Sequence, residues 1–219
     1  TLLIAGANGL FNFMPTDPVH FCVRLFLPPR CCFGLISILA AAGRFLKLNN
    51  ERIKHGYDLI LINRSRAKTE PLLGELLSNF PDCSVSLYEA DLADNRQIQQ
   101  AAEKVIHDHS DIHGLIHNAG VLKAGYDHSP EGHYIKYQVN TLTPIALTDL
   151  LKPALSDGKS NDETAKVIYV ATSAIKMTGN LNSNLLSKPQ KYGLFTSYAQ
   201  SKLAAIIYFT KKCATLFAG

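Results

Sequence analysis

The chain has 219 residues, 47% of them hydrophobic and 18% charged, which is enough apolar material for one globular domain with a substantial core. Its net charge of +4 is not concentrated in a block of lysine and arginine, so nucleic acid is not the expected partner. No apolar run is long enough to span a bilayer.

The cysteines bear on the cellular compartment. The chain has five of them without a Cys-x-x-Cys spacing, and it carries no recognisable secretion signal, so we expect reduced thiols and a cytoplasmic location. Because the chain begins at Thr1 without an initiator methionine, a leader already removed stays an alternative. Membrane attachment through a segment missing from the chain also stays open.

Short apolar runs alternate with segments of helical period along the chain. The runs expected as strands are residues 2–5, 58–62, 84–88, 112–117 and 166–172. The segments expected as helices are residues 43–56, 72–80, 94–107, 131–155 and 195–217. This alternation is typical of an α/β fold with a doubly wound parallel, Rossmann-like sheet. Ligands of such sheets bind at the carboxyl ends of the strands.

A glycine-rich turn, Gly-Ala-Asn-Gly, follows the first expected strand and would let a pyrophosphate approach the backbone at a helix N-terminus. The helix that should follow begins only at Gly43, because residues 10–41 show no clean period. We therefore interpret residues 1–219 as a single dinucleotide-binding domain with an insertion at about 10–41. The candidate pyrophosphate contacts are Gly6, Asn8, Gly9 and Gly43.

A serine and a tyrosine–lysine pair provide candidate chemistry near the end of the chain. An apolar run delivers Ser173 to a strand end, and Tyr198 and Lys202 are spaced to share one helical face. A tyrosine has a reference pKa of about 10, which a neighbouring ammonium lowers, so the pair suits proton transfer between a carbonyl and an alcohol. Tyr208 and Lys212 repeat the spacing, so spacing alone does not select the first pair.

Several motifs occur together in a fixed order. They are Gly6-Ala7-Asn8-Gly9, Asp91-Leu92, Asn118-Ala119-Gly120, Asn140, Ser173 and Tyr198-x-x-x-Lys202. In this order they resemble the short-chain dehydrogenase/reductase family, and the 25 residues from Ser173 to Tyr198 resemble its retinol-dehydrogenase-like and WW-domain-oxidoreductase-like branch. The resemblance implies an oxidoreductase that interconverts a carbonyl and an alcohol of a small molecule by hydride transfer. A homo-oligomer is a further possibility.

The resemblance also implies a role for each matching residue. Tyr198 would be the catalytic acid/base, Lys202 would lower its pKa and bind the nicotinamide ribose, and Ser173 would orient the substrate oxygen. Asn140 would hold a water molecule in a proton relay. The implied cofactor contacts are Asp91, Leu92, Asn118, Ala119, Gly120, Tyr198 and Lys202.

The end of the second expected strand bears on the choice of cofactor. Sites for NAD usually place a carboxylate there, on the ribose 2′-hydroxyl. Here the sequence reads Asn-Arg-Ser-Arg, and Arg64 could form charge-assisted bonds to a 2′-phosphate. We therefore expect NADP rather than NAD, with the alternative that Arg64 and Arg66 are merely solvated loop charges.

Two further features limit the functional interpretation. The chain stops at Gly219, soon after the expected catalytic helix, so the fold is expected to be C-terminally truncated relative to the family. A non-catalytic nucleotide-binding or interaction domain, or an inactive fragment of an incomplete gene model, therefore stays an alternative. His109, His113 and His117 have a metal-like spacing, but they run from a helix end into a strand, so no metal site is expected.

Overall fold

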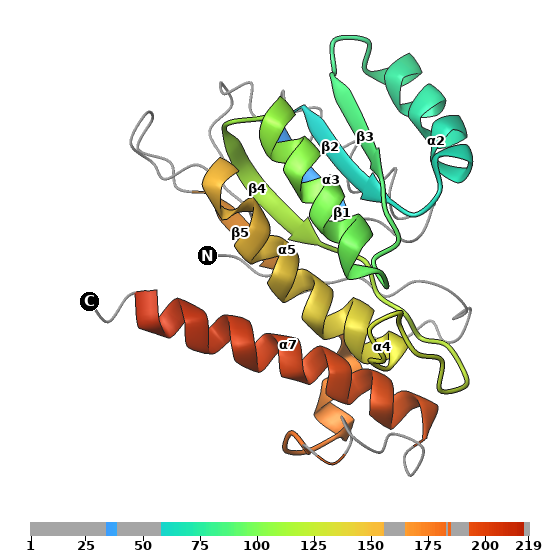
Figure 1. The fold of residues 1–219 in the computed structure, drawn as a ribbon, viewed down its shortest axis with the longest axis vertical. Helices are drawn as coiled ribbons and strands as arrows, with labels where there is room; N and C mark the ends of the chain where they lie inside the picture. The colour runs from blue at the N-terminus through green and yellow to red at the C-terminus, as the bar shows by residue number, and fades with distance from the viewer. Residues whose placement is uncertain (1–33, 39–57, 156–164, 183, 185–192, 217–219) are drawn as a thin grey trace.

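The computed structural model describes residues 34–38, 58–155, 165–182, 184 and 193–216. Five parallel strands form one sheet in the order β3-β2-β1-β4-β5 (Figure 1). The strands are β1 (Gly34–Ile38), β2 (Leu59–Asn63), β3 (Val85–Glu89), β4 (Ile112–His117) and β5 (Lys166–Tyr169). The order reverses between β1 and β4, where doubly wound sheets open a ligand crevice. The predicted α/β, Rossmann-like fold class is confirmed.

The strands next to β1 are buried along most of their length. The first four residues of β2 and all six residues of β4 are buried. Parallel sheets have both faces covered by helices, so their inner strands read as continuous hydrophobic runs and not as alternating ones. This explains why both strands could be recognised from the sequence alone.

The central strand differs from the expectation. Residues 2–5, expected as the first strand, lie outside the described residues, and β1 is formed by Gly34–Ile38 inside the expected insertion at 10–41. A short apolar run has no period that would tell which of two such runs fills one place in a sheet. The insertion at about 10–41 stays a prediction, although its residues Gly34–Ile38 form the central strand of the sheet.

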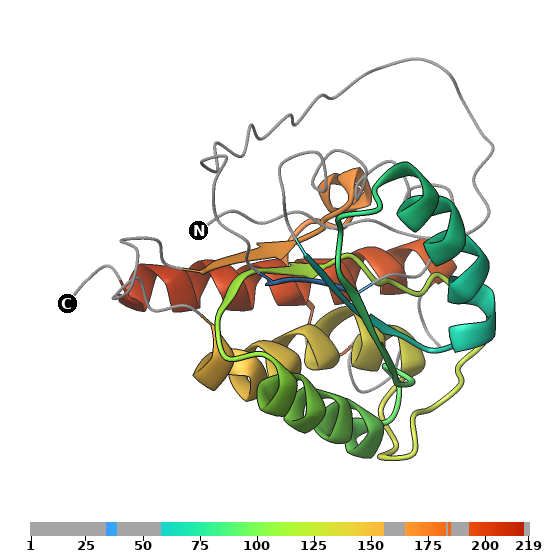
Figure 2. The same ribbon diagram turned by 90° about the horizontal axis from the view of Figure 1, so that it is seen from above.

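Helices cover both faces of the sheet. Helices α3 (Asn95–Asp108) and α5 (Thr143–Leu151) lie side by side on one face, and α2 (Arg66–Asn79) lies on the other (Figure 2). The main hydrophobic core fills the space between the sheet, α3 and α5. The last helix, α7 (Leu194–Leu216), packs against β5 and contacts α5.

Helix α2 begins earlier than the expected range of 72–80. The Ser65 hydroxyl accepts a hydrogen bond from the Lys68 amide over 3.4 Å, which satisfies one of the free amides at the helix start. The helix then continues through Pro71. Pro71 is the sixth residue of α2, so its missing N–H removes one hydrogen bond inside the helix without ending it.

The helix expected over residues 131–155 starts late and is divided. Gly132 has a φ of 83°, a left-handed conformation that a right-handed helix excludes. The helical segments are α4 (Ile135–Tyr137), the π-turn η1 (Gln138–Leu142), α5 and the 3₁₀ turn η2 (Lys152–Ala154). The widened turn carries Asn140, and single π-turns occur often at functional sites.

Candidate active site

Lys202 is the most deeply buried charged side chain of the candidate site. It lies on α7 with 0% exposure, and its ammonium donates to the carbonyl oxygens of Val170 at 3.2 Å and Ala119 at 3.5 Å. Val170 directly follows β5 and Ala119 lies just beyond β4, so the lysine joins two neighbouring strand ends. Burial disfavours the charged form and lowers the pKa of Lys202 to about 7.

Tyr198 lies one helical turn before Lys202 and is also buried, with 3% exposure. A separation of four residues places both side chains on one face of α7. The second tyrosine–lysine pair lies elsewhere: Lys212 forms an ion pair with Asp149 on α5, and the Tyr208 hydroxyl lies 3.4 Å from the same carboxylate. The two pairs therefore have different surroundings although their spacing is identical.

Asn140 joins the widened turn to the loop after β4. Its Oδ1 accepts from the Val121 amide at 2.8 Å, and its Nδ2 donates to the Val121 carbonyl at 3.1 Å and to the Ser201 hydroxyl at 2.9 Å. The side chain is fully buried. These bonds hold the strand-end loop against α7, next to Lys202, which is a positioning task in addition to the expected contact with water.

The loop after β4 fits closely around Lys202. Asn118 and Ala119 are buried, and a Cβ at Gly120 would lie 3.1 Å from Lys202 Nζ and 3.4 Å from Asn140 Oδ1. Any larger residue at Gly120 would displace one of these groups, so the glycine allows the close approach. The expected residues Asn118, Ala119, Gly120, Asn140 and Lys202 thus form one cluster.

Ser173 lies apart from this buried cluster. It is the first residue of the 3₁₀ turn η3 (Ser173–Met177) and is exposed, beyond the end of the shorter-than-expected β5. The preceding Thr172 caps the turn, since its hydroxyl accepts from the Ala174 amide at 3.3 Å. The turn η3 packs against α7, the helix that carries Tyr198 and Lys202.

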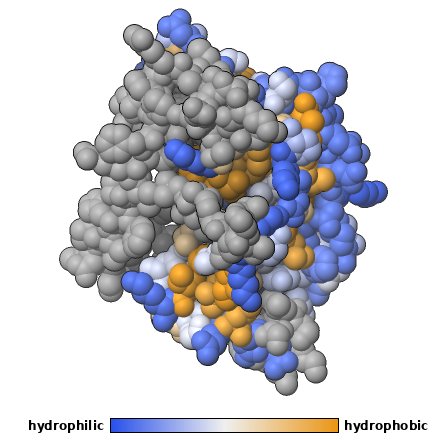
Figure 3. All heavy atoms as spheres, turned by 90° about the vertical axis from the view of Figure 1, so that its left-hand side faces the viewer, coloured by the Kyte–Doolittle hydropathy of each residue, from blue (hydrophilic) through white to orange (hydrophobic). Residues whose placement is uncertain are grey.

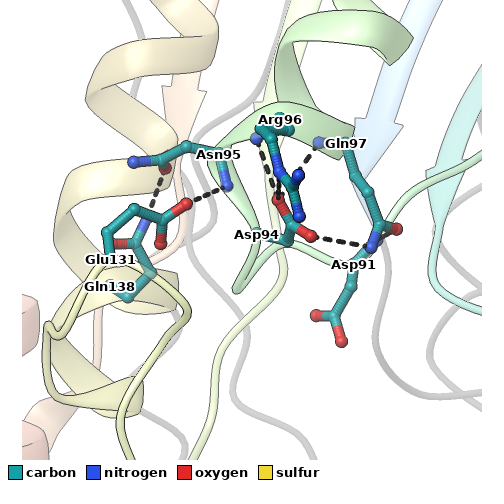
Figure 4. A network of polar contacts seen from close by, with 7 residues as sticks. All are labelled: Asp91, Asp94, Asn95, Arg96, Gln97, Glu131 and Gln138. Carbon is teal, nitrogen blue, oxygen red and sulfur yellow. Dashed lines mark hydrogen bonds and ion pairs between the residues drawn. The ribbon is translucent and has the colours of Figure 1, made fainter.

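Asp91 and Leu92 follow β3, and Asp91 belongs to the polar contacts that extend towards η1 in Figure 4. Asp91 Oδ1 accepts from the Ala93 amide at 3.0 Å, and its own amide donates to Gln97 Oε1 at 2.9 Å. The Leu92 carbonyl accepts from the Thr143 hydroxyl at 2.6 Å. The network fixes the turn after β3 at the same edge of the sheet as the loop after β4.

The two arginines after β2 have different surroundings. Arg66 donates from Nη2 to the Leu87 carbonyl at 3.0 Å and pairs with Glu70 at 3.6 Å, so it ties α2 to β3. Arg64 is exposed, and among the described residues its guanidinium has no hydrogen-bond partner. Arg64 therefore has the freedom to bind a phosphate, whereas Arg66 already has a structural task.

The described part of the site fits a dinucleotide. The loop after β4 lies at the strand-order reversal, and the loop after β3 lies at the same carboxyl edge of the sheet. The Lys202 ammonium beside the loop after β4 is a group that a polar ligand would use. The four glycine-turn candidates, Gly6, Asn8, Gly9 and Gly43, lie outside the described residues. Among the described residues, no cluster of three or more histidine, cysteine or acidic side chains is placed to hold a metal.

Sequence reasoning missed three buried polar side chains beside the site. Lys136 on α4 donates to the Ser197 hydroxyl at 2.7 Å, directly before Tyr198. His117 and Tyr169 end β4 and β5, and both pack against Phe209 of α7. A histidine or tyrosine within an apolar run is usually a core residue, so the sequence gave no sign that His117 and Tyr169 lie beside the site.

Comparison with known proteins shows the family of the chain. A family model described as short chain dehydrogenase matches residues 42–218. The chain belongs to the short-chain dehydrogenase/reductase family. Similar curated proteins include retinol dehydrogenase 12 of Bos taurus (26% identity, covering 85% of this chain and 58% of that protein) and human retinol dehydrogenase 14 (28%, 77% and 52%). The chain is therefore placed in the retinol-dehydrogenase-like branch.

Another relative is the short-chain dehydrogenase/reductase bet4 of Neocamarosporium betae, 30% identical and covering 74% of this chain and 52% of that protein. The chain thus spans about half the length of these curated relatives. A solved protein from Mycobacterium paratuberculosis is 26% identical, with a TM-score of 0.71 over 85% of this chain and 63% of that one. A short chain dehydrogenase from Escherichia coli CFT073, complexed with NADPH, has 21% identity and a TM-score of 0.56 over 78% and 66%.

Two surface properties complete the description. No helix in the described part of the chain combines the length and apolar composition that a membrane span requires. On the face shown in Figure 3, apolar residues gather in patches among charged ones. The most exposed large apolar side chains of the described residues are Met177 on η3 and Phe195 on α7, at 86% and 52%.

Proposed function

We propose that this chain contains the cofactor-binding and proton-transfer part of an NADP-dependent oxidoreductase that interconverts a carbonyl and an alcohol. The observation that carries the proposal is the placement of Tyr198 and Lys202, buried on one face of α7, with Lys202 bonded to the strand-end carbonyls beside Asn140. Membership of the short-chain dehydrogenase/reductase family supports the reaction class.

The residues divide the proton chemistry among them. When bound, the nicotinamide supplies or accepts the hydride. The Tyr198 hydroxyl gives a proton to the carbonyl oxygen during reduction and takes one from the alcohol during oxidation. The Lys202 ammonium favours the tyrosinate by its charge, Asn140 holds the relay water and the loop after β4, and Ser173 orients the substrate oxygen.

The substrate is a small molecule with an alcohol or a carbonyl group. Relatives named for retinol and for polyprenol support an apolar substrate for this chain too. Met177 and Phe195 are exposed on the same two elements that carry Ser173 and Tyr198, η3 and α7, and would suit such a molecule. A cytoplasmic location and a homo-oligomer remain part of the proposal, on the basis of the sequence.

The mechanism is tested by removing one hydroxyl at a time. Tyr198→Phe should reduce carbonyl-dependent NADPH oxidation by at least about 1,000-fold while leaving NADPH binding, because general acid–base catalysis is lost and nothing else is changed. The matched control Tyr208→Phe has the same sequence spacing to a lysine and should keep most activity. Rates are measured by NADPH absorbance with polar and apolar aldehydes; turnover by Tyr198→Phe near the parent rate would contradict the mechanism.

Cofactor preference is tested at Arg64. A 2′-phosphate bound by a guanidinium gains charge-assisted hydrogen bonds, so Arg64→Ala should weaken NADPH binding about tenfold and leave NADH binding unchanged. Arg96→Ala, at an exposed arginine on α3, is the control and should change neither. Both affinities are measured by quenching of nicotinamide fluorescence. Equal affinities of the parent for NADPH and NADH would contradict the preference.

A further inference from the structure

Tyr169, at the end of β5, contacts two residues of the candidate site at once. Its hydroxyl donates to the backbone carbonyl of Asn140 at 2.6 Å. The Lys202 ammonium lies over its ring, 4.8 Å from the ring centroid. The side chain is fully buried and also packs against Phe209, with the ring centroids 5.6 Å apart. One buried side chain on the sheet thus connects η1 with α7.

The Tyr169 hydroxyl gives the Asn140 carbonyl a hydrogen-bond donor from outside the helix. In an α-helix the carbonyl of Asn140 would accept from the amide of the residue four positions later. That residue is Pro144, which has no N–H. Burial and the nearby Tyr198 raise the pKa of Tyr169 well above its ordinary value, so its hydroxyl keeps the proton that it donates. The tyrosine therefore satisfies a buried carbonyl at the turn that carries Asn140.

The ring has a separate effect on Lys202. A cation over an aromatic face is attracted by the ring quadrupole, and the attraction increases when both are removed from water. This attraction to the Tyr169 ring favours the charged ammonium of Lys202, whereas burial favours its neutral amine. The titratable side chains that face Lys202 come from three elements: His117 on β4, Tyr169 on β5 and Tyr198 on α7.

We propose that Tyr169 is a positioning residue that holds the Asn140 turn through its hydroxyl and the Lys202 ammonium through its ring. Its effect on turnover rests on the proposed function. Its effects on Asn140 and Lys202 do not, because both can be measured in the protein without substrate or cofactor. The hydroxyl and the ring can also be removed separately, so each half of the proposal has its own variant.

Tyr169→Phe removes the hydroxyl and keeps the ring. Without its donor the Asn140 turn should loosen, and hydrogen exchange of the Val121 amide, which donates to Asn140 Oδ1 over 2.8 Å, should become at least about fivefold faster. The Ala102 amide in the buried part of α3 serves as the internal reference. In an active enzyme, kcat should fall about tenfold with little change in KM, because a residue that aids only the chemical step is disturbed.

Tyr169→Leu removes the ring as well. The ammonium should then lose its aromatic contact, and the pKa of Lys202 should fall by about one unit relative to Tyr169→Phe. It is measured by pH titration of the side-chain signal in protein labelled with ¹³C at the lysine ε-carbon, assigned with Lys202→Met. The control is Tyr208→Phe, which should leave both the Val121 exchange and the Lys202 titration as in the parent.

The outcomes separate this inference from the proposed function. Unchanged Val121 exchange in a folded Tyr169→Phe protein overturns the role of the hydroxyl, and equal Lys202 pKa values in the Phe and Leu variants overturn the role of the ring. If the Leu variant does not fold, the Phe variant alone decides through Val121. If the parent has no turnover but both effects occur, the proposed function fails and the positioning role stands.

Discussion

At the residue scale, burial sets the protonation of the groups beneath the site. His117 is fully buried, and burial, together with the charge of Lys202, lowers its pKa to about 3. Its Nε2 lies 2.7 Å from the Thr148 hydroxyl. That hydroxyl uses its hydrogen to donate to the Pro144 carbonyl at 2.8 Å, so it can only accept from the histidine. The histidine must therefore donate from Nε2, and it is neutral at pH 7. A second cation beside Lys202 is thereby avoided.

This histidine predicts a pH dependence of stability. The unfolded chain binds a proton at His117 below pH 6.5, whereas the folded protein binds it only near pH 3. Unfolding therefore takes up a proton between these values, and the free energy of unfolding should fall by up to about 1.4 kcal/mol per pH unit as the pH decreases from 6.5 towards 3.

His117→Phe tests this dependence because it keeps an aromatic ring against Phe209. The variant should be less stable than the parent at pH 7.5, by about 1 kcal/mol for the lost hydrogen bond, and its stability should fall less steeply with acid. His107→Gln, at an exposed histidine, is the control and should keep the parent's slope. Urea unfolding between pH 4 and 7.5 measures both; parallel pH profiles for parent and His117→Phe would contradict the assignment.

At the element scale, the π-turn η1 is held by bonds to its neighbours. Gln138 is fully buried, and its Nε2 donates to Asn95 Oδ1 at 2.8 Å, at the start of α3 (Figure 4), and to the Thr143 hydroxyl at 3.2 Å. The Thr143 hydroxyl in turn donates a hydrogen bond to the Leu92 carbonyl. Gln138 thus joins the turn that carries Asn140 to the start of α3, and together with Thr143 it joins that turn to the loop after β3.

Gln138→Leu should destabilise the protein by about 1 kcal/mol. The substitution leaves the buried Thr143 hydroxyl and the Asn95 Oδ1 of an exposed residue without this donor, and a buried acceptor without a donor costs roughly 1–3 kcal/mol. It also removes Gln138 Oε1, which has no hydrogen-bond partner among the described residues. Gln99→Leu on the exposed face of α3 is the matched control and should stay within about 0.5 kcal/mol of the parent. Urea denaturation measures the difference, and a Gln138→Leu protein as stable as the parent would show that the network is not needed.

At the scale of the whole molecule, the sheet has one central place and the sequence has two candidates for it. Gly34–Ile38 fills that place and pairs along both edges, with β2 and with β4. Residues 2–5 have a similar length and composition and precede the glycine-rich turn. Which run forms the strand decides where the phosphate-binding turn lies relative to Lys202.

Proline substitution distinguishes the two runs. A central strand cannot accept a proline without losing a ladder hydrogen bond, so Ile36→Pro should abolish cooperative thermal unfolding. Leu3→Pro makes the same change in the other run and should be tolerated. Circular dichroism during heating measures both variants. The opposite ranking would show that residues 2–5 form the central strand and that Gly34–Ile38 belongs to an insertion.

The sequence alone determined the fold class and the family. Buried parallel strands need continuous apolar runs, and these can be recognised from composition, as at 58–62 and 112–117. The cap at Asp94 was also predictable, because an aspartate before a helical segment accepts from the free amides, here those of Arg96 and Gln97. Such signals are local, since the residues that produce them are close together in the chain.

Only the tertiary structure decided how the site is assembled. The spacing to lysine is the same for Tyr198 and Tyr208, and in the sequence only the order of the motifs favoured Tyr198. The surroundings of each pair, strand-end carbonyls or Asp149, come from elements far away in the chain. Tyr169 gave no sequence signal, because its contacts with Asn140 and Lys202 exist only after β5, η1 and α7 have packed. Period and composition describe one segment at a time, whereas the chemistry of a buried site depends on which segments meet.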